Sequence, residues 1–273
     1  MERAIVMGSF DDLRSADVRF LEEAAKRGEL HVFIWSDDVT RALERYSPKF
    51  LIQERMYLLQ AIRYVHQIHL VEHLNERDRL PVHVEQFSGT WVVKEDDDNH
   101  QKRLYCASNG MKYHVIKKSL LNKFPRGQNN IPGNHLKRKK VVVTGCYDWF
   151  HSGHVRFFEE VSELGDLYVV AGSDRNVQLL KGKGHPMFPQ DERLYMVQSI
   201  RFVKQALISS GSGWMDAEQE IALIKPDIYV VNEDGDKPEK RSFCESQGIQ
   251  YVVLKRMPKE GLPKRQSVEL RGY

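Results

Sequence analysis

The 273-residue sequence contains only three cysteines, and none of them belongs to a Cys-x-x-Cys pair. This scarcity is typical of reduced thiols and argues against a disulfide framework or a structural zinc site. No apolar run reaches the ~18 residues that a membrane-spanning helix needs, and the N-terminus lacks the apolar segment of a signal peptide. We therefore predict a cytoplasmic protein without a membrane partner.

A large excess of charge of either sign is also missing. The 41 Lys and Arg residues nearly balance the 38 Asp and Glu residues, which leaves a net charge of +3. So small a surplus does not predict nucleic-acid binding. The basic run at residues 136–140 (LKRKK) is more typical of a solvated approach to a strand than of a nucleic-acid patch.

The chain repeats itself at an offset of 137 or 138 residues. Residues 2–28 match residues 139–165, and later segments match at nearly the same offset. The matched pairs include Gly8 with Gly145, Asp11 with Asp148, Arg55 with Arg193, Lys102 with Lys240 and Cys106 with Cys244. Agreement at one offset across separated segments predicts an internal duplication.

Each copy alternates apolar runs with amphipathic stretches, a pattern typical of a parallel sheet with helices on both faces. In the second copy we expect strands at 140–144, 167–172, 205–209, 228–232 and 250–255, with helices near 153–164, 190–202, 215–224 and 238–247. The predicted fold is α/β, with two tandem Rossmann-like doubly wound domains. They would span residues 1–124 and 139–273, joined by a Pro-, Gly- and Asn-rich linker at 125–138.

Two histidines lie where the first buried strand of the second copy gives way to a helix. His151 and His154 are three residues apart and so face one side of the first helical turn. Free N–H groups and the helix dipole attract phosphate at such a position. We predict a nucleotide site, and the alternative is a histidine pair that only caps or packs.

The segment Gly145-Cys146-Tyr147-Asp148, followed by His151-Ser152-Gly153-His154, resembles the G-x-F-D-x-x-H-x-G-H signature of cytidylyltransferases in the nucleotidylyltransferase superfamily. Tyr147 replaces the usual Phe. The resemblance implies that His151 and His154 are catalytic and that Gly145, Cys146, Tyr147, Asp148 and Gly153 contact the nucleotide. Two-copy ethanolamine-phosphate cytidylyltransferases have a similar arrangement, although their intact signature lies in the first copy.

The resemblance extends to a lysine and an arginine. Lys181 lies in a Lys/Gly stretch after the second strand, where family members place a lysine that reaches the triphosphate. Arg193 corresponds to an arginine at the start of a helix and would bind the nucleotide. Because Arg55 matches it in the first copy, structural pairing with a carboxylate is an equal alternative.

Two later segments also resemble family motifs. Glu233 and Asp234 correspond to the G-D-D segment of glycerol-3-phosphate cytidylyltransferases, with Asn232 in place of the glycine. Arg256 and Ser267 correspond to the R-x-x-G-[IL]-S-[ST]-[ST] segment, of whose hydroxyls only Ser267 remains. These four residues would bind the nucleotide, although a lone serine is as often a helix cap.

The first copy has Arg14-Ser15-Ala16-Asp17 where the second has the two histidines. A carboxylate at this point repels a triphosphate, so we expect this copy to keep the fold without the chemistry. His66, His69 and His73 have the spacing of metal ligands, but the matching segment of the second copy reads as a strand. No protein metal site is predicted.

The resemblance implies transfer of CMP from CTP to a phosphorylated alcohol or sugar, with release of pyrophosphate and with Mg²⁺ bridging the triphosphate. An adenylyltransferase that uses ATP and a non-catalytic nucleotide sensor are the alternatives. Loops such as residues 211–214 would form the acceptor pocket. Because family members commonly form homodimers, we expect the two copies to pair as an intramolecular pseudo-dimer.

Overall fold

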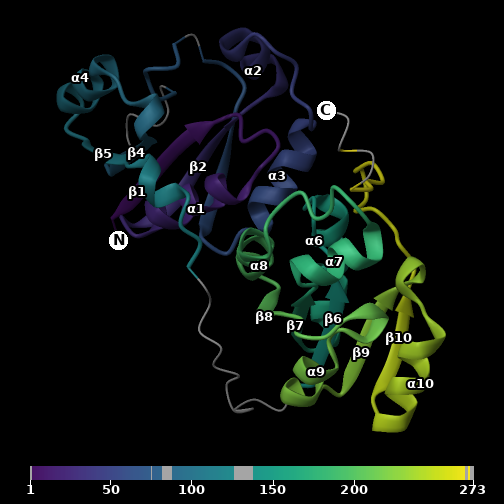
Figure 1. Cartoon of the computed structure of the whole chain (residues 1–273). Helices are drawn as coiled ribbons and strands as arrows, with labels where there is room; N and C mark the ends of the chain where they lie inside the picture. Colours follow the sequence, from purple (N-terminus) through teal and green to yellow (C-terminus); the bar gives the residue numbers. More distant parts are fainter. Residues whose placement is uncertain (1, 75, 82–87, 126–137, 268–269, 271–273) are drawn as a thin grey trace. The chain divides into compact units, whose positions relative to one another are not determined.

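A computed structural model of the chain describes residues 2–74, 76–81, 88–125, 138–267 and 270. The chain divides into two compact units, Met1–Phe124 and Pro125–Tyr273 (Figure 1). Each unit has a parallel sheet of its own. No described helix has the length and apolar character needed to cross a bilayer.

The first unit contains a five-stranded parallel sheet with strand order β3-β2-β1-β4-β5. The strands are β1 (Arg3–Gly8), β2 (Glu29–Trp35), β3 (Val65–Val71), β4 (Thr90–Lys94) and β5 (Lys112–Ile116). The helices are α1 (Ser15–Ala25), α2 (Asp37–Glu44), α3 (Ile52–Ala61), η2 (Glu95–Asp97), α4 (His100–Ser108) and α5 (Lys118–Leu121). His66 and His69 therefore lie on a strand.

The second unit contains a parallel sheet with order β10-β9-β6-β7-β8. Its strands are β6 (Lys140–Gly145), β7 (Asp166–Ala171), β8 (Val203–Ile208), β9 (Ile228–Asn232) and β10 (Gln250–Leu254). Its helices are α6 (Ser152–Leu164), α7 (Asp174–Lys181), α8 (Gln190–Gln198), η3 (Gly213–Met215), α9 (Glu218–Ile224), η4 (Glu233–Gly235) and α10 (Pro238–Gln247).

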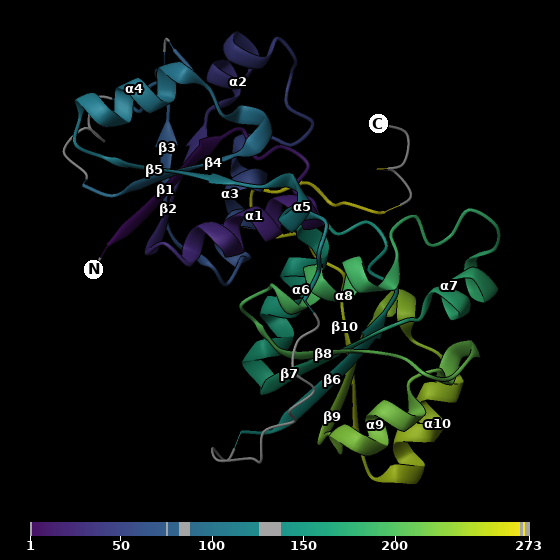
Figure 2. The same cartoon turned by 60° about the vertical axis from the view of Figure 1, so that its left-hand side comes forward.

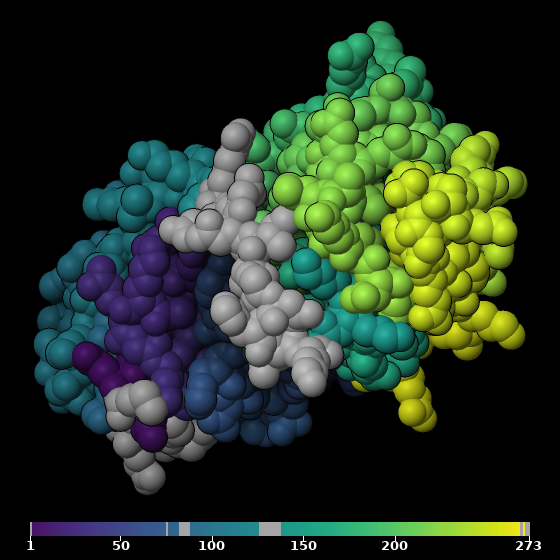
Figure 3. Space-filling model, turned by 90° about the horizontal axis from the view of Figure 1, so that it is seen from below, coloured from purple at the N-terminus to yellow at the C-terminus, as the bar shows by residue number. Residues whose placement is uncertain are grey.

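Helices cover both faces of the second sheet, with α6 and α8 on one side and α9 and α10 on the other (Figure 2). Strand β10 and helix α10 form one edge of the unit, drawn in yellow in Figure 3. The predicted α/β class with two parallel sheets is confirmed. Both sheets have the same relative strand order, read from the first to the last strand of each unit.

The order reverses beside the central strand, β1 in one unit and β6 in the other, because β4 and β9 return to its far side. Open α/β sheets bind ligands at this point, beyond the carboxyl ends of the strands. Val141, Val142 and Val143 of β6 are fully buried, which fixes the strand in the core. The loop that follows β6 is therefore presented at the switch point of the sheet.

Helix α7 was not predicted from the sequence. The Lys/Gly composition of residues 179–186 predicts one loop, but Lys181 is the last residue of α7, and the loop begins at Gly182. Ser173 caps the helix by accepting a hydrogen bond from the Asn176 N–H at 3.3 Å. Only Asn176 and Val177 of this helix are buried, so its sequence lacks the repeating apolar positions that indicate a helix.

Candidate functional site

The loop between β6 and α6 is shaped by Gly145 and Tyr147. Tyr147 adopts a left-handed backbone conformation with φ of 53°, and its ring folds back over Gly145. A Cβ at position 145 would lie 2.7 Å from the ring carbon Cζ, so any larger residue would displace the ring. Phe10 of the first unit has φ of 47°, two residues after Gly8. These residues thus set the path of the loop.

His151 and His154 meet at the N-terminus of α6. His151 is the N-cap, and its Nδ1 accepts a hydrogen bond from the Gly153 N–H at 3.1 Å. The His151 N–H in turn points at His154 Nδ1 at 3.4 Å. Since each Nδ1 is an acceptor, the proton of each neutral ring belongs on Nε2. Two N–H donors therefore sit side by side, with ring centroids 4.0 Å apart.

Both imidazoles are held in the neutral form. Burial, with smaller contributions from the charges of Arg256 and Arg265, lowers the pKa of His151 to about 3. Burial also lowers the pKa of His154 well below its usual value, with smaller effects from His151, Arg256 and Lys181. His151 Nε2 is buried and, within the described part of the chain, has no hydrogen-bond partner. The nearby positive charges and the unpartnered His151 donor together favour an anionic ligand here.

A steric constraint that was not predicted from the sequence requires glycine at position 153. A Cβ at this position would come within 2.9 Å of His151 Cε1 and 3.0 Å of His151 Nδ1. The glycine is required because the His151 ring occupies that space. The contact of Gly153 with the nucleotide, which the resemblance implies, stays a prediction.

The segment after β10 lies against the start of α6. Ser267 Oγ donates to the Trp149 carbonyl at 3.1 Å. Arg256 forms an ion pair with Asp234 at 2.6 Å, and its backbone N–H points at Glu233 Oε1 at 3.4 Å. The structure thus brings Arg256, Asp234 and Glu233 together at the carboxyl ends of β9 and β10.

A cavity of about 310 Å³ opens at the carboxyl ends of β6, β7 and β9. Lys181 and Cys146 lie on its wall, and the Lys181 charge counteracts burial, which on balance raises the pKa of the Cys146 thiol. The lining residues are Thr144, Gly145, Cys146, Gly172, Asn176, Val177, Leu180, Lys181, Gly213, Trp214, Asp216, Asp234, Gly235 and Lys240. The site residues predicted from the sequence do not include Asn176, Asp216 or Lys240, although Lys240 matches Lys102 in the repeat.

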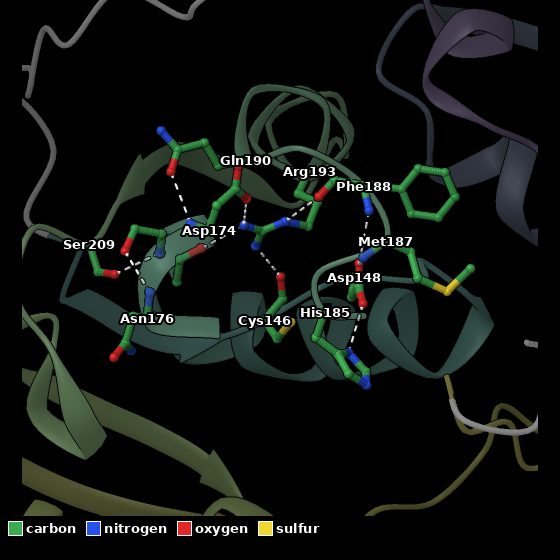
Figure 4. A network of polar contacts seen from close by, with 12 residues as sticks. Cys146, Asp148, Asp174, Asn176, His185, Met187, Phe188, Gln190, Arg193 and Ser209 are labelled. Atoms are coloured by element: carbon green, nitrogen blue, oxygen red, sulfur yellow. Dashed lines mark hydrogen bonds and ion pairs between the residues drawn. The ribbon is translucent and has the colours of Figure 1, made fainter. Parts of the chain in front are cut away.

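Asp148 is occupied by contacts within the unit. Its Oδ1 accepts from the backbone N–H groups of Met187 and Phe188 at 2.6 and 3.1 Å, and Oδ2 lies 3.2 Å from His185 Nδ1 (Figure 4). Asp148 is 4% exposed. The side chain therefore links residues 185–188 to the β6–α6 loop, and its predicted contact with the nucleotide stays a prediction.

Arg193 is also buried, at 1% exposed. Its guanidinium donates to the carbonyls of Phe188, Cys146 and Gly172 and to Asp174 Oδ1, at 2.6 to 2.9 Å (Figure 4). Four of its five N–H donors are thereby engaged. Structural pairing with a carboxylate, the alternative for Arg193, is present because Asp174 supplies that carboxylate, and nucleotide binding by Arg193 stays a prediction.

The first unit has a carboxylate in place of the second histidine. Asp17 Oδ2 accepts from the Arg14 N–H at 3.0 Å, and Asp17 Oδ1 accepts from Lys94 Nζ at 2.6 Å. The cavity at these strand ends is smaller, about 160 Å³, and Glu44 and Trp35 line it where Lys181 and Gly172 line the other. This position therefore has no imidazole pair, and the Asp17 carboxylate is paired with Lys94 of the same unit.

Comparison with known proteins places the second unit in a family. The family model "Cytidylyltransferase-like" matches residues 142–263. FAD synthase from Ferroglobus placidus is 35% identical over 125 residues, covering 45% of this chain and 78% of that protein. The bifunctional protein HldE from a Nitratiruptor species is 38% identical over 37% of this chain, and the match spans only 21% of that protein.

Among solved structures, the lipopolysaccharide core biosynthesis protein from Thermoplasma volcanium GSS1 aligns over 45% of this chain and 99% of its own, with 24% identity and a TM-score of 0.38. The sequence relatives establish the family, because the match to FAD synthase includes over three quarters of that enzyme at 35% identity. This chain belongs to the cytidylyltransferase-like family of nucleotidyltransferases.

Proposed function

We propose that the second unit transfers a nucleoside monophosphate from a nucleoside triphosphate to a phosphorylated alcohol or sugar, with release of pyrophosphate. The observation that carries the proposal is the pair of neutral imidazoles at the N-terminus of α6. Their Nε2–H donors lie together, and the charges of Lys181, Arg256 and Arg265 act on them. Such a site suits a polyanion that gains charge during reaction.

The chemistry follows from the acceptor. A phosphate monoester is already an anion near neutral pH, so an oxygen of its phosphate attacks the α-phosphorus without a general base. The bond between the α-phosphorus and the oxygen that bridges it to the β-phosphate breaks, and pyrophosphate leaves with the electron pair. His151 and His154 donate hydrogen bonds to the charge that develops, and Lys181 stabilises the departing phosphates. Mg²⁺ would enter with the triphosphate, held chiefly by phosphate oxygens.

The nucleotide we propose first is CTP, because the Gly145–Asp148 and His151–His154 segments resemble the cytidylyltransferase signature. ATP is the second candidate, and the similarity to FAD synthases favours it, since FAD contains an adenylyl group. A sensor that binds a nucleotide without reaction is a third possibility. It gives the buried, unpartnered His151 Nε2 donor no role in a reaction.

Pyrophosphate release tests the proposal. The whole chain is incubated with Mg²⁺, either CTP or ATP, and a panel of phosphate monoesters, beside His154→Ala and the control Asp17→Ala in the first unit. We expect one nucleotide to support turnover, His154→Ala to lower it ~10²–10³-fold, and Asp17→Ala to leave it unchanged. Turnover in His154→Ala within a few-fold of the parent would refute the assignment, and binding without turnover for every acceptor would favour the sensor.

A further inference from the structure

Lys240 is a buried cation in the cavity of the second unit. The residue is 7% exposed, its Nζ lies 3.4 Å from Thr144 Oγ1, and it sits 5.7 Å from the centre of the Tyr229 ring. Within the described residues, no carboxylate oxygen comes within 4.0 Å of this Nζ. Burial lowers the pKa of Lys240, and the charge of Asp216, which lies beyond ion-pair distance, offsets only part of that effect.

The first unit shows what the same lysine does when its charge is satisfied. Lys102, at the matching position of α4, is 5% exposed and lies 6.0 Å from the Trp91 ring. Its Nζ donates to the Asp97 carbonyl at 2.7 Å and lies 3.6 Å from Asp78 Oδ1. Lys240 has neither contact, although it occupies the same place behind the fourth strand of its sheet. Lys240 is instead one of the residues that line the cavity.

Two carboxylates face the same cavity, and each is already engaged. Asp216, which matches Asp78 in the repeat, accepts from Ser209 Oγ at 2.5 Å and retains further acceptor capacity. Asp234 is paired with Arg256. Besides Lys181, the cavity therefore offers a ligand a strong donor, Lys240, and a strong acceptor, Asp216. A hydroxyl-bearing molecule fits this pair, because each hydroxyl can accept from the ammonium and donate to the carboxylate.

A cationic ligand fits less well. Trp214 is 50% exposed on the cavity wall, and an aromatic face of this kind can bind an ammonium group. Lys237 already occupies that position, because its Nζ lies 4.8 Å from the centre of the Trp214 ring. An amino-alcohol phosphate would bring a further cation to a cavity that Lys181 and Lys240 line and that Lys237 adjoins at Trp214.

The cavity adjoins the histidine pair through Lys181. Lys181 lines the cavity and its charge also acts on His154, whereas Arg256 and Arg265 act on the imidazoles from the segment after β10. A triphosphate would lie between the α6 N-terminus and that segment. With Lys181 at the departing phosphates, the acceptor phosphate would approach the α-phosphate from the cavity side, and the rest of the acceptor would extend toward Lys240.

We propose, on the basis of the proposed function, that Lys240 and Asp216 bind hydroxyl groups of the acceptor, so that this site selects a phosphorylated polyol or sugar and rejects amino-alcohol phosphates. Lys240 is thus a specificity residue that the family signature does not include. On this proposal, the Lys240 ammonium lacks an ion pair in the free protein because the hydroxyl groups of the bound acceptor accept its hydrogen bonds.

An acceptor panel tests the selectivity of the whole chain. Glycerol 3-phosphate and hexose phosphates are compared with phosphoethanolamine and phosphocholine, using pyrophosphate release with the nucleotide that supports turnover. We expect kcat/KM for the best polyol or sugar phosphate to exceed that of both amino-alcohol phosphates by about 10-fold or more. Preference for an amino-alcohol phosphate overturns this inference and leaves the proposed function intact. Failure of every acceptor contradicts the proposed function instead.

Matched variants test Lys240 without depending on turnover alone. We expect Lys240→Met to keep or raise the melting temperature of the free protein, because an unpaired buried charge is removed, while the same change at Lys102 lowers it. Lys240→Met should raise the acceptor KM about 10- to 100-fold with little change in the nucleotide KM, and Lys102→Met should change neither. Asp216→Asn, which keeps the side-chain volume, should raise the acceptor KM about 10-fold.

The inference is overturned if Lys240→Met lowers the melting temperature as much as Lys102→Met does, since Lys240 would then be structural. An unchanged acceptor KM in both Lys240→Met and Asp216→Asn would overturn it equally. Should Lys240→Met fail to fold, that result itself marks the lysine as structural and contradicts the proposal.

Discussion

Arg55 and Arg193 form the same network in their respective units. Each Nε donates to the carbonyl of a phenylalanine five residues earlier, Phe50 at 3.0 Å and Phe188 at 2.9 Å. Each also forms an ion pair with an aspartate at the start of a helix, Asp37 at 2.6 Å and Asp174 at 2.7 Å. Because the first unit has this arginine without the histidine pair, the network serves the fold rather than the chemistry.

Replacement of either arginine by lysine should therefore destabilise its own unit. Lysine cannot reproduce the planar set of donors, and the carbonyls and the aspartate are left partly unsatisfied. We expect a loss of roughly 1–3 kcal/mol in the free energy of unfolding for Arg55→Lys and for Arg193→Lys, measured by urea denaturation. Unchanged stability together with weakened nucleotide binding in Arg193→Lys would show that Arg193 binds the nucleotide and is not needed for the fold.

The nucleotide should bind once per chain. In the first unit the Asp17 carboxylate stands where His154 stands in the second, and Lys94 is paired with it. A triphosphate entering there would meet a carboxylate and would have to break an ion pair. Calorimetric titration of the whole chain with CTP and with ATP should give a stoichiometry of one for the nucleotide that binds. Two sites of similar affinity would contradict this account of the first unit.

The stability contributed by His151 should depend on pH in a defined window. Its folded pKa is lowered to about 3 from an unfolded value near 6.5, so between these values only the unfolded chain binds the proton. The contribution is complete above pH 6.5 and is lost as pH falls, at about 1.4 kcal/mol per pH unit.

Urea unfolding of the parent and of His151→Asn measures this effect, since asparagine also caps helices but does not titrate. From pH 7 to pH 5 the parent should lose about 2 kcal/mol of stability relative to the variant. A difference that stays constant over this range would show that His151 is not held neutral.

Lys181 should contribute to nucleotide binding through its charge. It closes α7 on the wall of the cavity, and its charge reaches both Cys146 and His154. We expect Lys181→Gln to weaken triphosphate binding by roughly 10-fold or more, and the loss should shrink as salt is added, because the residue is exposed. Lys183→Gln, two residues further along the exposed loop, is the matched control and should bind normally.

The sequence by itself determined the features that depend on local pattern. The apolar runs and their spacing predicted two parallel α/β sheets, because a strand buried on both faces must be apolar along its length. The strand–loop–helix segment with His151 and His154 predicted an anion site, because histidine spacing and helix ends are set within a few residues. The constant offset of the repeat also related the two units residue by residue.

Only the tertiary structure decided which polar groups remain free for a ligand. Asp148 and Arg193 have the residue types of a nucleotide site, but long-range contacts with residues 185–188 and with strand-end carbonyls engage them. Lys240 and Lys102 occupy matching positions of the repeat, but they contact different partners, because other elements of each unit supply those partners. A hydrogen-bonding group serves a ligand only where the fold leaves it unpaired, and that pairing is a property of the packed chain.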